Sequence, residues 1–282
     1  MPAPENRVPV LIAGWLDAAH ATRIAAAEPE RIELIYEPDL LPTTRYEADH
    51  HGPPRQLTDE QRRRWREQLH RAEIAFEFDW ERPNQLLERA PRLRWVQATS
   101  SGIGPLVEHL GLAGSPLLIT NAAGIHAQPL AEFVLLAALY FAKEMPRLNT
   151  WKADRHWERF CGQEVSGSRM TLIGLGRVGS RIAELSAALG IEVTGHRRTP
   201  GGEAPPGVRR VVDSAGLDRA LAETDLLVIA APDTLETANL VDRRRLSLLP
   251  ARAVVVNVGR GSIVDEPALI EALQSEIGRA HV

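Results

Sequence analysis

The sequence of 282 residues is poor in cysteine, with Cys161 as its single thiol. No intrachain disulfide can form, which fits a protein of a reducing compartment. Uncharged runs of membrane-spanning length are also missing. The first residues, MPAPENRVPVLIAGW, lack the basic start and long apolar segment of a signal peptide. The sequence therefore predicts a soluble, cytoplasmic protein without a membrane span.

An excess of charge of one sign is missing as well. The chain has 33 basic and 37 acidic residues, a net charge of −4 and a pI of about 6.2. This balance gives no electrostatic reason to expect nucleic acid or an anionic membrane as a partner. We also expect no metal centre. His50 and His51 are adjacent in the proline-rich loop 38–56, but no Cys, His and carboxylate cluster at ligand spacing accompanies them.

The chain is rich in short apolar runs that alternate with amphipathic stretches. This alternation is typical of βαβ units and parallel sheets. In the first half it predicts strands at 8–14, 32–37, 73–78, 93–99 and 116–121, with helices at 17–27, 58–71 and 83–89. In the second half it predicts strands at 170–176, 191–195, 208–212, 225–232 and 253–259. We therefore predict an α/β protein with two doubly wound parallel sheets.

A strongly apolar helix at 129–145 joins the two series of strands. The segment 147–168 after it looks irregular and holds two tryptophans, Trp151 and Trp157. These features predict three parts: a first domain at 1–125, a crossing helix with an arm at 126–168, and a second domain at 169–282.

Three glycines in the segment TLIGLGRVGSRIAEL have the G-x-G-x-x-G spacing, after an apolar strand and at the start of a helix. Gly174 permits a tight turn, Gly176 lets a pyrophosphate approach the backbone, and Gly179 lets the helix pack close to the strand. The helix N-terminus adds free N–H groups and partial positive charge. We expect a dinucleotide here; the alternative is a domain of the same architecture that binds no nucleotide.

The next strand ends in VTGHRRTP, where an NAD-binding domain usually has Asp or Glu to bond both ribose hydroxyls. Arg197 and Arg198 follow His196 instead. A guanidinium can pair with a 2′-phosphate in a fork geometry, whereas a carboxylate would repel it. We therefore predict that NADP(H) is preferred and that NAD(H) remains possible. The alternative is that both arginines are ordinary exposed charges.

Three motifs together resemble the D-isomer-specific 2-hydroxyacid dehydrogenases: MTLIGLGRVGSRIAEL, LLVIAAPDTLETANLV and AVVVNVGRGSIVDEPALIEAL. VQATSSGIGPL and NAAGIHAQPLAEFVL agree more loosely. The resemblance implies a flavodoxin-like substrate domain at 1–125 and a Rossmann cofactor domain at 169–282. It also makes a homodimer plausible, through the crossing helix and arm.

The resemblance assigns roles to individual residues. Arg260 matches the catalytic arginine that binds the carboxylate and carbonyl of a 2-oxo acid, and Ser101 and Gly102 match the loop whose N–H groups hold the substrate carboxylate. Hydride transfer to a ketone builds negative charge on its oxygen, which a fixed guanidinium stabilises. The implied cofactor contacts are Gly174, Leu175, Gly176, Arg177, Val178, Gly179, Arg197, Arg198, Ala231, Pro232, Thr237 and Val258.

One part of the family pattern is not matched. The family's proton donor is a histidine, held by a glutamate, beyond the catalytic arginine; only His281 follows Arg260, and we do not assign it that role. We count five strands in the second series, so we expect a cofactor domain that lacks its last strand. The final IGRAHV breaks the preceding helical pattern and resembles a translated sequencing adapter. We expect the native sequence to depart from the printed one after Ser275 or Glu276.

The sequence thus predicts an oxidoreductase that passes a hydride between NADP(H) and a small 2-oxo acid of the glyoxylate or hydroxypyruvate type. The chain as printed is expected to be poorly active because its proton donor is missing. Two alternatives remain. One is another family member, such as a phosphoglycerate dehydrogenase; the other is a non-catalytic protein of this fold that senses dinucleotide.

Overall fold

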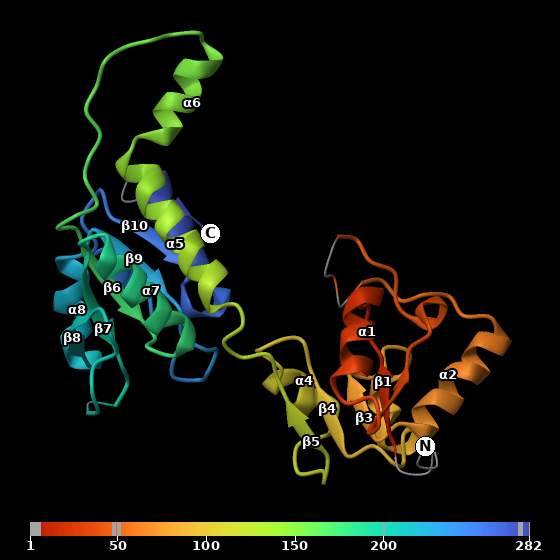
Figure 1. The fold of residues 1–282 in the computed structure, drawn as a ribbon. Helices are drawn as coiled ribbons and strands as arrows, with labels where there is room; N and C mark the ends of the chain where they lie inside the picture. The colour runs from red at the N-terminus through yellow and green to blue at the C-terminus, as the bar shows by residue number, and fades with distance from the viewer. Residues whose placement is uncertain (1–6, 47–48, 50–51, 200, 276–278, 282) are drawn as a thin grey trace. The chain divides into compact units, whose positions relative to one another are not determined.

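The structure, a computed structural model, describes residues 7–46, 49, 52–199, 201–275 and, for the backbone, 279–281. The chain divides into two compact units, Met1–Ala123 and Gly124–Val282 (Figure 1). The adjacent His50 and His51 lie outside the described residues.

The first unit is a five-stranded parallel sheet in the order β2-β1-β3-β4-β5. This is the flavodoxin-like order that the sequence predicts. Its strands are β1 (Val8–Ile12), β2 (Ile32–Ile35), β3 (Ile74–Phe76), β4 (Trp95–Gln97) and β5 (Leu118–Thr120). Its helices are α1 (Ala18–Ala27), η2 (Pro38–Leu40), α2 (Asp59–Arg71), η3 (Pro83–Gln85), α3 (Leu86–Arg89) and α4 (Gly104–His109).

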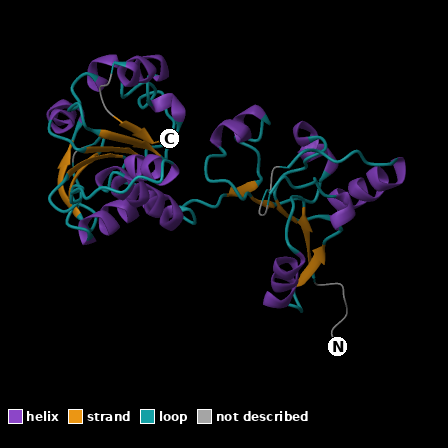
Figure 2. Cartoon of the chain, turned by 90° about the horizontal axis from the view of Figure 1, so that it is seen from above, coloured by secondary structure: helices purple, strands orange, loops and turns teal. Residues whose placement is uncertain are grey.

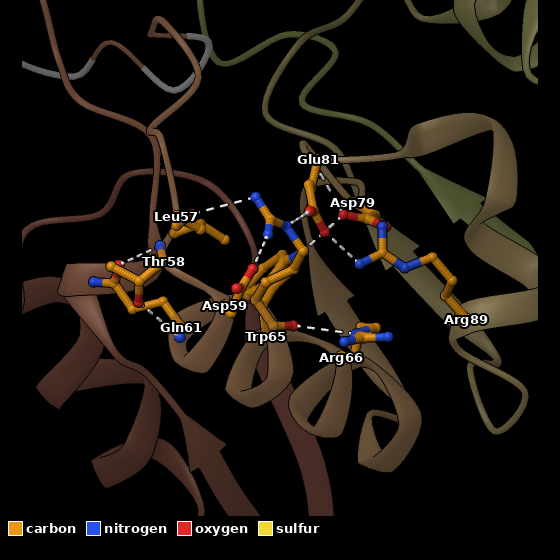
Figure 3. A network of polar contacts seen from close by, with 10 residues as sticks. Leu57, Thr58, Asp59, Gln61, Trp65, Arg66, Asp79, Glu81 and Arg89 are labelled. Atoms are coloured by element: carbon orange, nitrogen blue, oxygen red, sulfur yellow. Dashed lines mark hydrogen bonds and ion pairs between the residues drawn. The ribbon is translucent and has the colours of Figure 1, made fainter.

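A buried polar network fixes the segment that follows β3 (Figure 3). Asp79 is 1% exposed and accepts a hydrogen bond from Nε1 of the fully buried Trp65 on α2 at 2.9 Å. Arg89 on α3 forms ion pairs with Asp79 at 2.8 Å and with Glu81 at 2.5 Å. A buried charge is tolerated only when it is paired in this way. The segment after the carboxyl end of β3 is therefore bonded to both α2 and α3.

The second unit contains a six-stranded parallel sheet in the order β11-β10-β9-β6-β7-β8, which is the Rossmann arrangement. The strands are β6 (Arg169–Ile173), β7 (Glu192–His196), β8 (Val208–Val212), β9 (Leu226–Ile229), β10 (Val254–Asn257) and β11 (Arg279–His281). The helices are α5 (Ala127–Ala142), α6 (Met145–Ala153), α7 (Arg177–Ala188), α8 (Ser214–Ala222), α9 (Arg243–Leu246), η4 (Gly261–Ile263) and α10 (Glu266–Gln274). Two doubly wound parallel sheets are confirmed.

The strand count of the second sheet corrects the prediction in one detail. All five expected strands are present, and β11 is a sixth, parallel to β10 with Val255 opposite Ala280. It was not predicted because its residues, Arg279–His281, include two polar side chains and lack the apolar run that marks the other strands.

Both faces of the second sheet are buried, as the doubly wound architecture requires. Side chains alternate along each strand: Leu172 and Val228 pack toward α5 and α7, whereas Ile173 and Leu227 pack toward α8 and the segment after β10. Figures 1 and 2 show helices on both sides of this sheet. The apolar helix α5 contributes Ala131, Val134, Ala137 and Ala138 to this core, and it belongs to the second unit.

The arm after α5 is more regular than expected. The sequence looked irregular from 147, but Met145–Ala153 forms α6, with Pro146 in the first turn, where proline needs no helical hydrogen bond. The guanidinium of Arg147 lies 4.2 Å from the ring centre of Trp151. Trp157 is 84% exposed.

Candidate functional site

The turn after β6 has the form that a pyrophosphate requires. Gly174 has a φ of +99°, and a Cβ there would lie 2.7 Å from the backbone nitrogen of Ala231. A Cβ on Gly179 would lie 1.9 Å from the carbonyl oxygen of Gly174, so α7 can approach the strand only with glycine at this position. A Cβ on Gly176, the N-cap of α7, would meet nothing within 4 Å. The open side of the turn thus lies at the helix N-terminus, where an anion binds best.

The loop after β9 lies directly against this turn. Ala231 is buried, and its backbone contacts Gly174, so β6 and β9 bring their carboxyl ends together at the topological switch point. Beyond it, Thr237 closes the loop on itself: its hydroxyl donates to the carbonyl of Pro232 at 2.7 Å and accepts from the N–H of Thr234 at 2.8 Å. The closed loop begins directly after Ala231, the residue that contacts Gly174.

Arg260 follows β10 in a loop that its neighbours hold firmly. The Asn257 side chain accepts from the Gly259 N–H at 2.9 Å and donates to the Arg260 carbonyl at 3.0 Å. A Cβ on Gly259 would lie 2.9 Å from the carbonyl oxygen of Ala231, so this loop touches the loop after β9. The Arg260 guanidinium is exposed and makes one hydrogen bond, to the Gly259 carbonyl at 3.2 Å. It has no acidic partner in the described part of the chain.

The two arginines after β7 point to different neighbours. Arg197 donates to the carbonyl of Gly201 at 2.6 Å and lies over the loop that leads to β8. Arg198 is exposed and pairs with Glu236 of the loop after β9 at 2.9 Å. The pKa of Glu236 is lowered by its hydrogen bonds to backbone and Thr234 and by the charge of Arg198. The positive charge of Arg198 is therefore shared with a carboxylate.

His196 precedes these arginines and is almost fully buried, with 6% of its surface exposed. Its carbonyl accepts from the Gly174 N–H at 3.3 Å, which ties β7 to the turn. Burial lowers the pKa of the imidazole, the positive charge of Arg245 lowers it further, and Asp213 opposes the shift. The side chain is consequently neutral at physiological pH.

In the first unit, Ser101 and Gly102 lie in the loop between β4 and α4. The carbonyl of Ser100 accepts from the Ala122 N–H, and that of Ser101 accepts from the Asn121 side chain, both at 3.3 Å. In a trans peptide the N–H points opposite to the carbonyl. The N–H groups of Ser101 and Gly102 therefore point away from Asn121 and Ala122, and neither has an acceptor among the residues that the structure describes.

Sequence reasoning missed several residues that shape these loops. Asn257 could have been found from its place in NVGRG, two residues before Gly259. Ser262, whose hydroxyl donates to Asp233 at 2.9 Å, joins the loops after β10 and β9 and has no sequence signal. Glu77, which binds the Thr99 backbone and hydroxyl, lies 22 residues away in the chain. Among the described residues, no group of three His, Cys, Asp or Glu side chains could hold a metal ion, and no helix is long and apolar enough to cross a membrane.

Comparison with known proteins gives these features a context. Residues 135–281 match the family described as D-isomer specific 2-hydroxyacid dehydrogenase, NAD binding domain. A glyoxylate reductase of Aeropyrum pernix is 33% identical over 199 residues, 67% of this chain and 58% of that protein. A D-3-phosphoglycerate dehydrogenase of Mycobacterium bovis is 30% identical over 193 residues, 67% of this chain and 36% of that protein. The matched region therefore spans less than two thirds of either relative.

A solved structure agrees over nearly the whole chain. The D-isomer specific 2-hydroxyacid dehydrogenase of Xanthobacter autotrophicus, in complex with NADPH and MES, is 25% identical, with a TM-score of 0.70. The similarity covers 98% of this chain and 81% of that one. The similarity therefore extends over both units.

Proposed function

Because this chain belongs to the D-isomer specific 2-hydroxyacid dehydrogenase family, we propose that it reduces a small 2-oxo acid with NADP(H). Glyoxylate and hydroxypyruvate are the substrates that we favour, since a similar protein is a glyoxylate reductase. In this proposal, the cofactor domain at 169–282 holds the cofactor and the domain at 1–125 holds part of the substrate.

The observation that carries the proposal is the position of Arg260. Its guanidinium lies at the carboxyl end of β10, in a loop that contacts Ala231, which in turn contacts the dinucleotide turn. Arg260 has no acidic partner among the described residues, and Asn257 holds its backbone through hydrogen bonds, so its guanidinium can pair with an anionic ligand. It would hold the substrate carboxylate and stabilise the negative charge that develops on the carbonyl oxygen. The proton must come from another group, because a guanidinium does not give up its proton.

The cofactor fits the turn on structural grounds. The space at Gly176 leaves room for a pyrophosphate beside the first N–H groups of α7, and a Cβ at Gly174 or Gly179 would fill the turn with clashes. When bound, a reduced nicotinamide supplies the hydride. In this proposal Leu175, Arg177 and Val178 of the turn would contact the cofactor, together with Val258 after β10 and the loop closed by Thr237 after β9.

The preference for NADP(H) over NAD(H) rests on Arg197 and Arg198. Both follow the end of β7, where the ribose of an adenine dinucleotide lies in this fold. A 2′-phosphate would receive charge-assisted hydrogen bonds from these guanidinium groups. The similar protein from Xanthobacter autotrophicus was solved with NADPH.

In the first unit, Ser101 and Gly102 would anchor the substrate carboxylate through their two N–H groups, which have no acceptor among the described residues. Two adjacent backbone donors can bind one carboxylate without adding a charge.

We also propose a homodimer that forms through α5 and the arm. Leu136 on α5 is 56% exposed and Trp157 on the arm is 84% exposed, and large apolar side chains of this kind favour burial against a partner. Sedimentation equilibrium would show twice the chain mass of 31.1 kDa for a dimer and the chain mass for a monomer.

The test of the function is a cofactor-oxidation assay. NADPH absorbance would be followed with glyoxylate, hydroxypyruvate, phosphohydroxypyruvate and pyruvate in turn. We expect slow but saturable oxidation with glyoxylate or hydroxypyruvate, in keeping with the poor activity expected from the sequence. Arg260→Gln should lower kcat/KM by about 10²–10³-fold and leave the Kd for NADPH unchanged, because its charge acts on the substrate oxygen. Arg252→Gln is the matched control: this exposed arginine lies beside the opposite end of β10 and should have no effect.

The outcomes separate the proposal from its alternatives. A clear preference for phosphohydroxypyruvate would assign the chain to the phosphoglycerate dehydrogenase type. Tight NADPH binding without turnover of any 2-oxo acid would leave a dinucleotide-sensing protein as the better account. Loss of activity in the Arg252 variant as well would show that the assay reports on stability.

A further inference from the structure

Glu77 combines two features that are unusual for a glutamate. It follows β3 with a φ of +74°, in the left-handed region that residues with a Cβ seldom occupy. Its side chain is also buried, with 5% of the residue surface exposed. Each feature costs free energy, so both persist only where the surrounding structure holds them in place.

The Glu77 carboxylate is bound to the start of the loop that contains Ser101 and Gly102. One of its oxygens accepts hydrogen bonds from both the backbone N–H and the hydroxyl of Thr99. The Glu77 N–H donates to the Gln97 carbonyl at 2.9 Å, which continues the β3–β4 ladder into the same region. The side chain thus makes a bridge from the end of β3 to the residue two places before Ser101.

The loop is held on its other side by the segment after β5. The Asn121 side chain donates a hydrogen bond to the Ser101 carbonyl, and the Ala122 N–H donates one to the Ser100 carbonyl. Because Glu77 holds the loop on one side and Asn121 on the other, the N–H groups of Ser101 and Gly102 have a fixed direction. The buried pairs of Asp79 with Trp65 and Arg89 keep the segment after β3 from moving away.

We propose that Glu77 is a positioning residue, which fixes the loop Thr99–Gly102 so that the Ser101 and Gly102 N–H groups converge on the substrate carboxylate. This inference rests on the proposed function and adds a residue to it. The negative charge of Glu77 is not needed for this role, because an amide oxygen can accept the same two hydrogen bonds. The variants Glu77→Gln, Glu77→Ala and Glu77→Gly therefore separate hydrogen bonding from charge and from backbone strain.

The experiment measures the affinity for oxalate, a planar dicarboxylate that resembles glyoxylate, in the presence of NADPH, and the KM and kcat for glyoxylate. Glu77→Ala and Glu77→Gly should raise the oxalate Kd and the glyoxylate KM by about tenfold, since two hydrogen bonds to a charged group are lost. Glu77→Gln should bind oxalate at least as tightly as the original chain. Effects on kcat should be smaller, and the Kd for NADPH should not change in any variant.

A comparison of Glu77→Ala with Glu77→Gly tests whether backbone strain, and not the lost carboxylate, explains a loss of oxalate affinity. Both lack the carboxylate, but only glycine adopts the positive φ freely. Equal losses of oxalate affinity in the two variants support the inference, whereas full affinity in Glu77→Gly would show that only the backbone conformation matters and would overturn it. Unchanged oxalate binding in Glu77→Ala would also overturn it while the proposed function stands. If the original chain neither binds oxalate nor reduces glyoxylate, the proposed function fails, and the inference fails with it.

Discussion

At the scale of single residues, the proposed 2′-phosphate and Glu236 would compete for the same guanidinium. Arg198 would serve a 2′-phosphate, but in the structure it pairs with Glu236 from the loop after β9. Both side chains are more than half exposed, so solvent screens the pair and it holds Arg198 weakly. A bound phosphate must displace this carboxylate or share the guanidinium with it.

Glu236→Gln should therefore strengthen NADPH binding. Removing the competing charge is expected to lower the Kd for NADPH by about two- to five-fold, which is the size of an exposed ion pair. NADH lacks the 2′-phosphate, and its Kd should change less. Fluorescence titration of both cofactors provides the measurement.

Glu271→Gln is a suitable control for this substitution, because Glu271 forms a similar exposed pair with Arg243 on the surface of α9 and α10. It should alter neither Kd. A Glu236 variant that binds NADPH and NADH with equal gains would argue against a 2′-phosphate at Arg198.

At the scale of elements, two glycines in the turn between β6 and α7 have different roles. Gly179 is required by packing, since a Cβ would overlap the Gly174 carbonyl at 1.9 Å. Gly176 has open space where its Cβ would be, and its φ of −74° suits any residue. Glycine at position 176 is therefore not needed for packing within the protein, and we expect that it leaves room for a bound ligand.

Alanine at the two positions should give opposite results. Gly179→Ala is expected to destabilise the second unit by about 1–3 kcal/mol, because backbone atoms must shift. Gly176→Ala should leave the free energy of unfolding within about 0.5 kcal/mol of the original value. It should nevertheless weaken NADPH binding by about tenfold or more, since the pyrophosphate can no longer reach the helix N–H groups.

Urea unfolding and a cofactor titration on the same two proteins check this prediction. Normal NADPH affinity in a stable Gly176→Ala protein would mean that the cofactor does not bind at this turn.

The elements also show which parts of the structure can be predicted from sequence. The turn between β6 and α7 was predictable because its three glycines fall within six residues, Gly174–Gly179, between an apolar strand and a helix. The pairs Glu77–Thr99 and Arg198–Glu236 join residues 22 and 38 positions apart, and neither pair has a local pattern. Arg197 and Arg198 could be identified as charges, but their separate partners depend on how the loops after β7 and β9 meet.

At the scale of the whole molecule, a buried histidine links the stability of the second unit to pH. The pKa of His196 in the folded protein lies below its ordinary value of 6.5, first because of burial and then because of Arg245, with Asp213 opposing. Below pH 6.5 the unfolded chain therefore binds a proton that the folded chain resists. By linkage, stability is fully present above about pH 6.5 and falls as the pH is lowered through the range beneath it.

Urea unfolding between pH 7.5 and 5.5 isolates this effect. The carboxylates with lowered pKa values, such as Asp218 at about 2, lose their contribution only at lower pH. A single histidine limits the slope to about 1.4 kcal/mol per pH unit. His196→Leu, which cannot be protonated, should remove most of the slope, whatever its effect on stability at pH 7.5. His20→Asn, which changes an exposed histidine on α1, should retain it. If the pH dependence of the free energy of unfolding is the same in His196→Leu, the proton is taken up at another group. Burial of His196 would then not be what limits stability in mild acid.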